Sequence, residues 1–403
     1  MTMKTSSWLK ISLVNLVIVA LLGLLMRYKI GFEFPLFNQK YIQYSHYHFA
    51  FYGWVAHTLM VLMTHALFKD NADFKIARYQ PVFIANLVSS YGMLVSFLSL
   101  GYGAVSVGFS VAAIFSTYWF SLLFIRDLRW YNVNQIAAKW FRAALFFNFL
   151  STLGVFALGY MMLTKVINQD VYIATSYYFL HFQYNGWFFF GCMGLFINYI
   201  NGVGPVHIQI YRLFLVSCIP AYFLSVLWLQ MPTWLYVIVV VSAILQTYAS
   251  VLLLAALLKF RPAEIIKLPL ILRYLLLFVG LALSVKLLLQ LGSTVPAISK
   301  LAFGFRPIVI AYLHLVLLAV ISLFLLFYIY ASDIFSRSGA VLTSLLIFSI
   351  GVFLNELVLA IQGIAAFSYT LIPYANEMLF VVAVILFLGS ILLVCYSKKK
   401  QIL

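Results

Sequence analysis

Runs of apolar residues long enough to cross a lipid bilayer recur along almost the whole chain. Each run, folded as a helix, could cross the roughly 30 Å of hydrocarbon in a membrane. Inside lipid, only helices and closed barrels satisfy every backbone hydrogen bond. We therefore expect residues 1–403 to form a single all-α domain, a polytopic bundle of twelve transmembrane helices. The twelve runs cover approximately residues 8–26, 45–68, 80–100, 105–125, 143–163, 173–200, 207–230, 233–258, 269–291, 306–330, 338–362 and 373–396.

The basic residues of the chain indicate how these helices are oriented. Of the 403 residues, 65% are hydrophobic and 8% are charged, yet the net charge is +16. In a membrane protein this excess marks the cytoplasmic side rather than a nucleic-acid partner. With the N-terminus inside, eighteen of the 25 Lys and Arg residues lie on cytoplasmic segments, and seven, among them Arg27 and Lys286, lie on or near the outer side. Both termini are therefore expected in the cytoplasm, in a bacterial inner membrane, with the lipid bilayer as partner and no nucleic acid.

Three further patterns limit the interpretation. The three cysteines lie far apart within apolar runs, so neither a disulfide framework nor a thiolate metal site is expected. The first apolar run continues into Arg27 without a small-residue cleavage site, which predicts a retained first span rather than a signal peptide. No clear internal repeat is visible.

The histidines fall at one depth of the predicted membrane. The second, sixth and tenth predicted spans all run from outside to inside. His46, His48, His181 and His314 each lie within about ten residues of the outer end of one of these spans. Imidazole inside a bilayer usually has a function, and heme iron is a common partner for it. We therefore expect the outer halves of these three helices to supply a ligand pair.

Three short motifs support a family resemblance. They read His46-Tyr-His-Phe-Ala-Phe-Tyr52-Gly53, His181-Phe-Gln-Tyr-Asn185-Gly186-Trp187 and Ala311-Tyr312-Leu313-His314. With the twelve-span plan, they resemble the catalytic subunit (subunit I) of the heme-copper oxidase and nitric oxide reductase superfamily. In that family the second-helix histidine and the second histidine of a tenth-helix His-x-His motif bind a low-spin heme. The resemblance implies one low-spin heme b held by His46 and His314.

The chain also departs from the family pattern. The family has two adjacent histidines on its seventh helix, where residues 223–230 contain none. Tyr312 replaces the high-spin heme ligand, and Asn185 replaces the glutamate of the reductases. The resemblance therefore implies electron transfer or heme-based sensing more readily than reduction of oxygen or nitric oxide. A second metal is doubtful, with His181 as its lone candidate ligand or else a polar residue lining a cavity. Small respiratory subunits or a cytochrome electron donor are the implied partners.

Several alternatives stay open at the individual residues. His48 could replace His46 as the ligand, Tyr312 could bind iron as a phenolate, and His314 could be a core histidine bonded to a neighbouring carbonyl. Arg306, at the outer end of the tenth span, is suitably placed for a heme propionate. Glu356, within the eleventh span, could serve a proton path or pair with Arg306 or Lys300.

Two other function classes compete with a cytochrome. Twelve spans with both termini inside is also a common plan for solute transporters, which would bind no heme. A heme- and copper-containing membrane protein of the nitric-oxide stress type also begins its motifs with His-x-His. If the chain is an enzyme, we expect an oxidoreductase related to the terminal oxidases or nitric oxide reductases, but turnover of a substrate does not follow from the two heme ligands.

Overall fold

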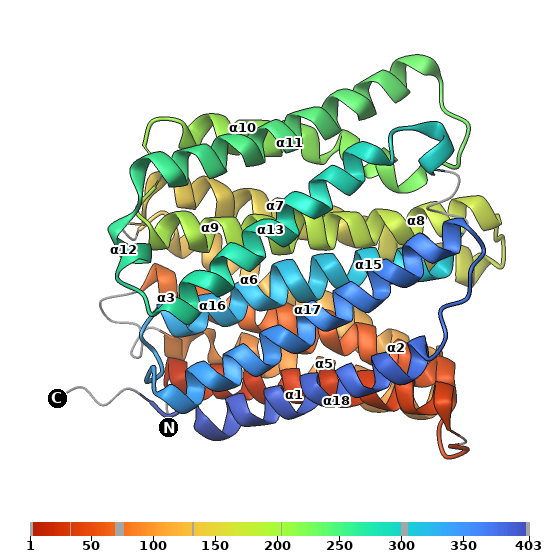
Figure 1. Cartoon of the computed structure of the whole chain (residues 1–403), viewed down its shortest axis with the longest axis horizontal. Helices are drawn as coiled ribbons and strands as arrows, with labels where there is room; N and C mark the ends of the chain where they lie inside the picture. The colour runs from red at the N-terminus through yellow and green to blue at the C-terminus, as the bar shows by residue number, and fades with distance from the viewer. Residues whose placement is uncertain are drawn as a thin grey trace.

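The computed structural model of the chain is a bundle of helices that run roughly along one direction (Figure 1). It describes residues 3–32, 34–68, 76–130, 133–202, 204–299 and 305–399. Within these residues, helices occupy all twelve of the predicted ranges. Nine helices in this part of the chain are long and apolar enough to cross a membrane, and a tenth span results if residues 204–218 and 220–226, bent by 47°, act as one. The multi-pass membrane fold is thus confirmed, whereas the count of twelve spans is not.

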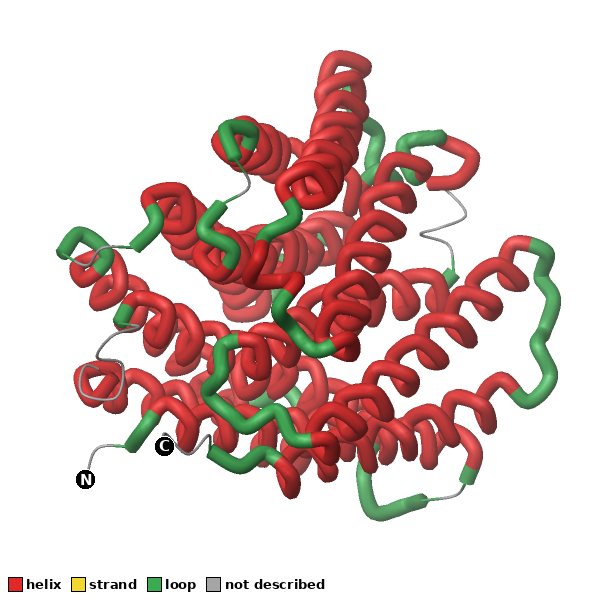
Figure 2. The backbone as a smooth tube through the Cα atoms, turned by 60° about the vertical axis from the view of Figure 1, so that its left-hand side comes forward, coloured by secondary structure: helices red, strands yellow, loops and turns green. Residues whose placement is uncertain are grey.

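The helices fall into three successive groups, each with four helical segments, and Figure 2 shows the loops that join them. The second segment of every group is a long helix in several parts. The first group is α1 (Thr5–Gly31), α2 (Gln39–Phe49) with η1 (Ala50–Ala56) and α3 (His57–Leu67), α5 (Gln80–Leu100) and α6 (Ala104–Asp127). The second is α7 (Gln135–Thr164), α8 (Gln169–His181) with η4 (Phe182–Phe188) and α9 (Phe189–Tyr199), α10 (His207–Cys218) with η5 (Pro220–Val226), and α11 (Thr233–Phe260). After the short α12 (Ala263–Ile266), the third is α13 (Leu270–Gly292), α15 (Arg306–His314) with η6 (Leu315–Ser322) and α16 (Leu323–Ala331), α17 (Gly339–Phe367) and α18 (Ala375–Tyr396).

The three groups close into a ring. In each group the first segment packs on the second, the second on the third and the third on the fourth. Between groups, α6 packs on α7, α11 on α13 and α18 on α1. The C-terminal parts of the three second segments, α3, α9 and α16, contact one another at the centre of the ring. Nearly all of their residues are buried. The structure therefore has a threefold repeat of four helices that is not evident in the sequence.

Each of the three central helices contains a π-helical stretch within four residues after one of its histidines. The stretches η4 and η6 begin at the residue after His181 and His314, and η1 begins four residues after His46. Trp54 in η1 donates its indole N–H to the Ser322 hydroxyl in η6 at 2.8 Å, which joins two of the stretches. π-helical turns are rare and are found mostly at functional sites. The three π-helical stretches therefore indicate a candidate functional region at this level of the bundle.

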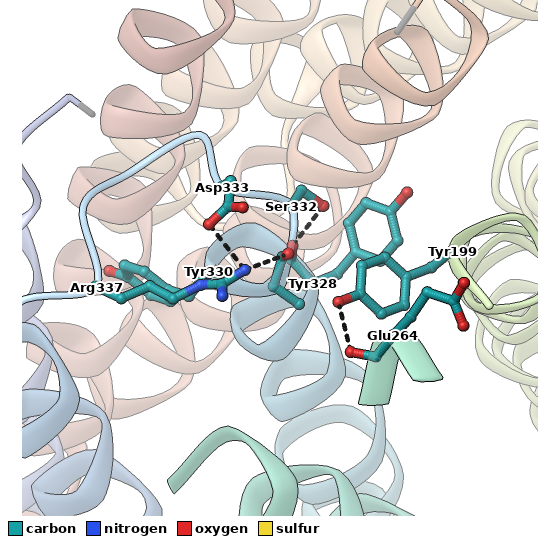
Figure 3. Close-up of polar contacts among 8 residues, drawn as sticks. Tyr199, Glu264, Tyr328, Tyr330, Ser332, Asp333 and Arg337 are labelled. Atoms are coloured by element: carbon teal, nitrogen blue, oxygen red, sulfur yellow. Dashed lines mark hydrogen bonds and ion pairs between the residues drawn. The ribbon is translucent and has the colours of Figure 1, made fainter. Parts of the chain in front are cut away.

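A charged cap closes the end of α16. Arg337 donates hydrogen bonds from Nε to the Tyr330 carbonyl at 2.8 Å and from Nη2 to the Ala331 carbonyl at 2.7 Å (Figure 3). The same Nη2 pairs with Asp333 at 2.8 Å. The last carbonyls of a helix lack partners within the helix, and a cation there also opposes the helix dipole. Arg337 therefore fixes the end of a central helix.

Removal of this cap should destabilise the bundle. We expect Arg337→Met to lower the free energy of unfolding by about 1.5–3 kcal/mol, the range for hydrogen bonds to a charged group. Asp333→Asn should change it little, because the Asp333 side chain is half exposed and such ion pairs contribute little. Thermal unfolding of the purified protein, followed by tryptophan fluorescence, measures both. An Arg337→Met protein with the wild-type midpoint would show that the cap does not contribute.

Candidate functional site

The structure brings His46 and His314 together from helices that are far apart in the sequence. His46 lies on α2, and His314 is the last residue of α15. These helices and α8 lie toward one end of the bundle, opposite to the chain termini (Figure 1). His46 and His314 are close enough to interact electrostatically, and Arg27 of α1 interacts with both. The two predicted heme ligands therefore lie within electrostatic range of each other.

Both imidazoles are held in the same way. The Nδ1 atom of His46 lies 3.1 Å from the carbonyl oxygen of Val19, and Nδ1 of His314 lies 2.9 Å from that of Ile310. A carbonyl only accepts hydrogen bonds, so each Nδ1 carries the proton and each Nε2 keeps its lone pair. Neither Nε2 has a hydrogen-bond partner within the described residues. This is the arrangement of a metal-ligating histidine, which is oriented by a carbonyl on its other nitrogen.

The helices around the pair leave it partly accessible. The side chains of α15 that the structure describes, residues 307–314, are all at least partly exposed, although α15 belongs to a central helix. His46 is also only half-buried, and Gly23 of α1 lies opposite it. The continuation of α15 into η6 and α16 is by contrast mostly buried. Both imidazole side chains are therefore less tightly packed than the residues of η6 and α16.

Arg27 is the cation that the structure places at this site. The sequence indicated it only as a charge near the outer side, but it lies within α1, and its guanidinium has no hydrogen bond or ion pair among the described residues. Arg306, the predicted propionate partner, begins α15, and its side chain lies outside the described residues. A guanidinium suits carboxylate ligands because it can offer two parallel N–H donors. Arg27 can therefore serve a carboxylate beside the imidazoles.

The contacts of His48 are with Phe97 and Tyr102 rather than with the His46–His314 pair. Its ring stacks on Phe97 of α5, with centroids 4.2 Å apart and planes 4° apart. Its Nε2 lies 3.1 Å from the hydroxyl oxygen of Tyr102, in the loop after α5. These contacts favour His46 over His48 as the ligand that faces His314.

His181 is fully buried, and both of its nitrogens are hydrogen bonded. Nε2 lies 2.9 Å from the Cys218 carbonyl, and Nδ1 lies 3.1 Å from Nδ2 of Asn185. Within the described ranges, no three His, Cys, Asp or Glu side chains are grouped so that they could hold a metal ion. Metal binding by His181 stays a prediction, and its hydrogen bonds favour the alternative of a structural polar residue.

The contacts of Tyr312 and Glu356 are with residues other than His46 and His314. Tyr312 precedes His314 by two residues, about 200° around the helix, and packs near Tyr184 with ring centroids 6.4 Å apart. It therefore points away from the iron that His314 would bind. Glu356, on α17, accepts a hydrogen bond from the Asn355 amide at 3.2 Å. Its predicted partners, Lys300 and the Arg306 side chain, lie outside the described residues, so its role in a proton path stays a prediction.

A buried polar network near η4 was not expected from the sequence. Ser116 donates to the amide oxygen of Asn86 at 3.3 Å, and Gln183 donates to Ser151 at 2.8 Å. Asn148 Nδ2 donates to Thr117 at 3.1 Å, so the network joins the first group of helices to the second. Single amide and hydroxyl side chains in apolar runs follow no recognisable spacing. The sequence therefore does not predict that they contact one another in the fold.

Comparison with known proteins leaves the chain without an assigned family. No family model matches it, and no curated protein matches its sequence. The function is therefore argued from the His46–His314 site and its surroundings.

Proposed function

We propose that this chain is a multi-pass membrane heme protein in which His46 and His314 hold one low-spin heme b. One observation carries the proposal: both imidazoles donate Nδ1–H to a backbone carbonyl and keep a free Nε2 within one site. Two unrelated structural histidines on separate helices would have no reason to share the same tautomer. The pattern therefore favours paired axial ligands over unrelated structural histidines.

Each residue of this site would have its own role in holding a heme. His46 and His314 would hold the heme iron, and the carbonyls of Val19 and Ile310 would orient the two imidazoles and raise their basicity. Arg27 would pair with a propionate. Heme supplies a one-electron redox centre. Because both histidines would be engaged in holding the heme, the residues favour electron transfer or redox sensing over reduction of a bound substrate.

The proposal extends to the topology. We place twelve spans in a bacterial inner membrane, with both termini in the cytoplasm and a respiratory subunit or cytochrome as electron donor. In support, residues 39–67 and 169–199 form two further helical runs in addition to the helices that meet the membrane criterion. At about 1.5 Å per residue each run is long enough to cross the hydrocarbon. Basic residues such as Lys4, Arg78, Arg129 and Lys259 lie near helix ends or in the short segments between helices.

A difference spectrum tests the proposal directly. The purified chain should show a narrow b-type α-band in its dithionite-reduced minus oxidised spectrum. A pyridine hemochrome assay should give about one heme per chain, since one histidine pair holds one iron. Absence of heme from protein produced with ample heme supply would overturn the proposal and favour a transporter. Equimolar copper in a metal analysis would instead favour the heme- and copper-containing stress protein.

A further inference from the structure

Four residues of α1, each four positions after the last, lie on the side of this helix that packs on α2 and η1. They are Asn15, Val19, Gly23 and Arg27. The Val19 carbonyl contacts Nδ1 of His46, and a Cβ atom at Gly23 would lie 3.5 Å from Cε1 of the same imidazole. Arg27 interacts with His46 electrostatically. Residues four apart share one face of a helix, so Asn15 extends the face of α1 that holds the proposed ligand.

Asn15 binds the backbone of η1. Its Nδ2 donates to the Gly53 carbonyl at 2.6 Å, and the side chain is fully buried. In a regular α-helix the Gly53 carbonyl would accept from the N–H of His57. The His57 N–H instead goes to the carbonyls of Tyr52 and Trp54, at the end of the π-helical stretch. The Asn15 amide therefore serves a carbonyl that has lost its usual α-helical partner.

A hydroxyl from a third helix orients this amide. Tyr91 on α5 donates to Oδ1 of Asn15 at 2.7 Å. An asparagine amide has an acceptor oxygen and a donor NH₂, and here the oxygen meets a hydroxyl while the NH₂ meets a carbonyl. A buried polar side chain that is satisfied at both ends is rigid. Asn15 therefore joins α1 to η1 in one defined orientation.

We propose that Asn15 is a positioning residue for His46. Among the hydrogen bonds between α1 and the helix formed by α2 and η1 are those of Asn15 with Gly53 and of His46 with Val19. Two bonds at separate levels restrain both the register and the rotation of the helices, so the Asn15 bond holds the Val19 carbonyl opposite His46. That carbonyl keeps the proton on Nδ1 and leaves Nε2 free for a metal. The inference deepens the proposed function and rests on it wherever heme is concerned.

Nitrogen-15 NMR of protein prepared without heme tests the positioning role. In histidine-labelled protein, the His46 signals, identified by their loss in His46→Ala, should report the Nδ1–H tautomer. Asn15→Leu keeps a side chain of similar size but removes the amide. It should shift His46 toward the Nε2–H tautomer, because the Val19 carbonyl is no longer held opposite Nδ1. An unchanged His46 signal in the folded Asn15→Leu protein would overturn the proposal.

Asn86→Leu is the matched control. Asn86 is also fully buried and donates to a carbonyl of η1, that of Tyr52 at 3.1 Å, but from α5 instead of α1. Both variants should lower the thermal unfolding midpoint, because each leaves a buried carbonyl of η1 without its partner. Only Asn15→Leu should shift the His46 tautomer. A shift of the same size in Asn86→Leu would show that any disturbance of η1 moves His46, and it would overturn the specific role of Asn15.

Tyr91→Phe provides a second variant of the same contact. It removes only the hydroxyl that orients the Asn15 amide and should shift the His46 tautomer in the same direction by a smaller amount. If Asn15→Leu does not fold, Tyr91→Phe carries the comparison. A wild-type His46 signal in Tyr91→Phe would then overturn the proposal.

Potentiometric titration of the heme-loaded protein gives an independent readout. The Val19 carbonyl makes the His46 imidazole a stronger electron donor and thereby favours ferric iron. Loss of an orienting partner weakens metal binding about 10- to 100-fold. A tenfold loss confined to ferric heme corresponds to a midpoint potential about 59 mV higher, and we expect a rise of this order in Asn15→Leu but not in Asn86→Leu. A wild-type protein that binds no heme would overturn the proposed function and leave the NMR test in place. A heme-loaded Asn15→Leu protein with the wild-type potential would overturn the positioning role alone.

Discussion

The His314→Ala protein is expected to lose the proposed heme while it keeps its fold. His314 is half-buried, and the hydrogen bond from its Nδ1 goes to a carbonyl of its own helix, so its removal leaves no buried group of another helix unpaired. Loss of a residue that merely orients a metal ligand already weakens metal binding about 10- to 100-fold. Loss of the ligand itself should weaken it at least as much. His46→Ala should also lose the heme, although it removes in addition a contact with the Val19 carbonyl of α1.

His48→Ala is the matched control for this prediction. His48 lies two residues from His46, but it stacks on Phe97 and contacts Tyr102, and we expect its replacement to leave most of the heme in place. Heme per chain after purification and the reduced-minus-oxidised spectrum measure all three variants. If His48→Ala loses the heme and His46→Ala keeps it, the ligand on α2 is His48.

Gly186→Ala adds a single methyl group, yet it should clearly lower the free energy of unfolding. A Cβ atom at Gly186 would lie 2.5 Å from Cβ of Phe147 on α7, much closer than two carbon atoms approach. Phe147 is completely buried and stacks on Phe182, with centroids 5.8 Å apart. Cβ of Phe147 moves only with its backbone, so α7 and η4 would have to separate. Overpacking of this kind costs about 1–3 kcal/mol.

Gly159→Ala makes the same chemical change on α7 without a clash. A Cβ atom at Gly159 would meet nothing within 4 Å. Alanine in an open helical position should raise the stability by up to about 1 kcal/mol relative to glycine. Thermal unfolding midpoints in one detergent compare the two variants. Equal midpoints would mean that α7 and η4 do not approach as closely as the structure has them.

The sequence predicted the helices well, but it did not predict which of them are central. The apolar runs correspond to helices because a bilayer requires about twenty apolar residues per crossing. In lipid, however, the outer surface of a helix is as apolar as its packed surface. Leu59 on central α3 is fully buried and Leu122 on α6 is 72% exposed, yet both are leucines. Neither the threefold ring nor the π-helical stretches could therefore be inferred from composition.

The candidate site could be predicted in part. Helix direction and depth placed His46, His48, His181 and His314 at one level of the membrane, and the family resemblance then selected His46 and His314 as the expected pair. Arg27 was seen only as a charge near the outer side. A long cationic side chain near a helix end can reach the interface or turn inward. Which of these occurs depends on the rotation of the helix about its axis, and that rotation is set by packing with distant parts of the chain.

The contact between α1 and α18 has a consequence for how the protein is made. These are the first and the last long helices of the chain, and they pack side by side where the ring closes. During synthesis α1 enters the membrane while the helix that will cover its flank has not yet been translated. That flank therefore lacks its partner until α18 has been translated. The ring is completed only by its final helix, so a chain truncated before α18 leaves an open bundle whose first helix lacks its partner.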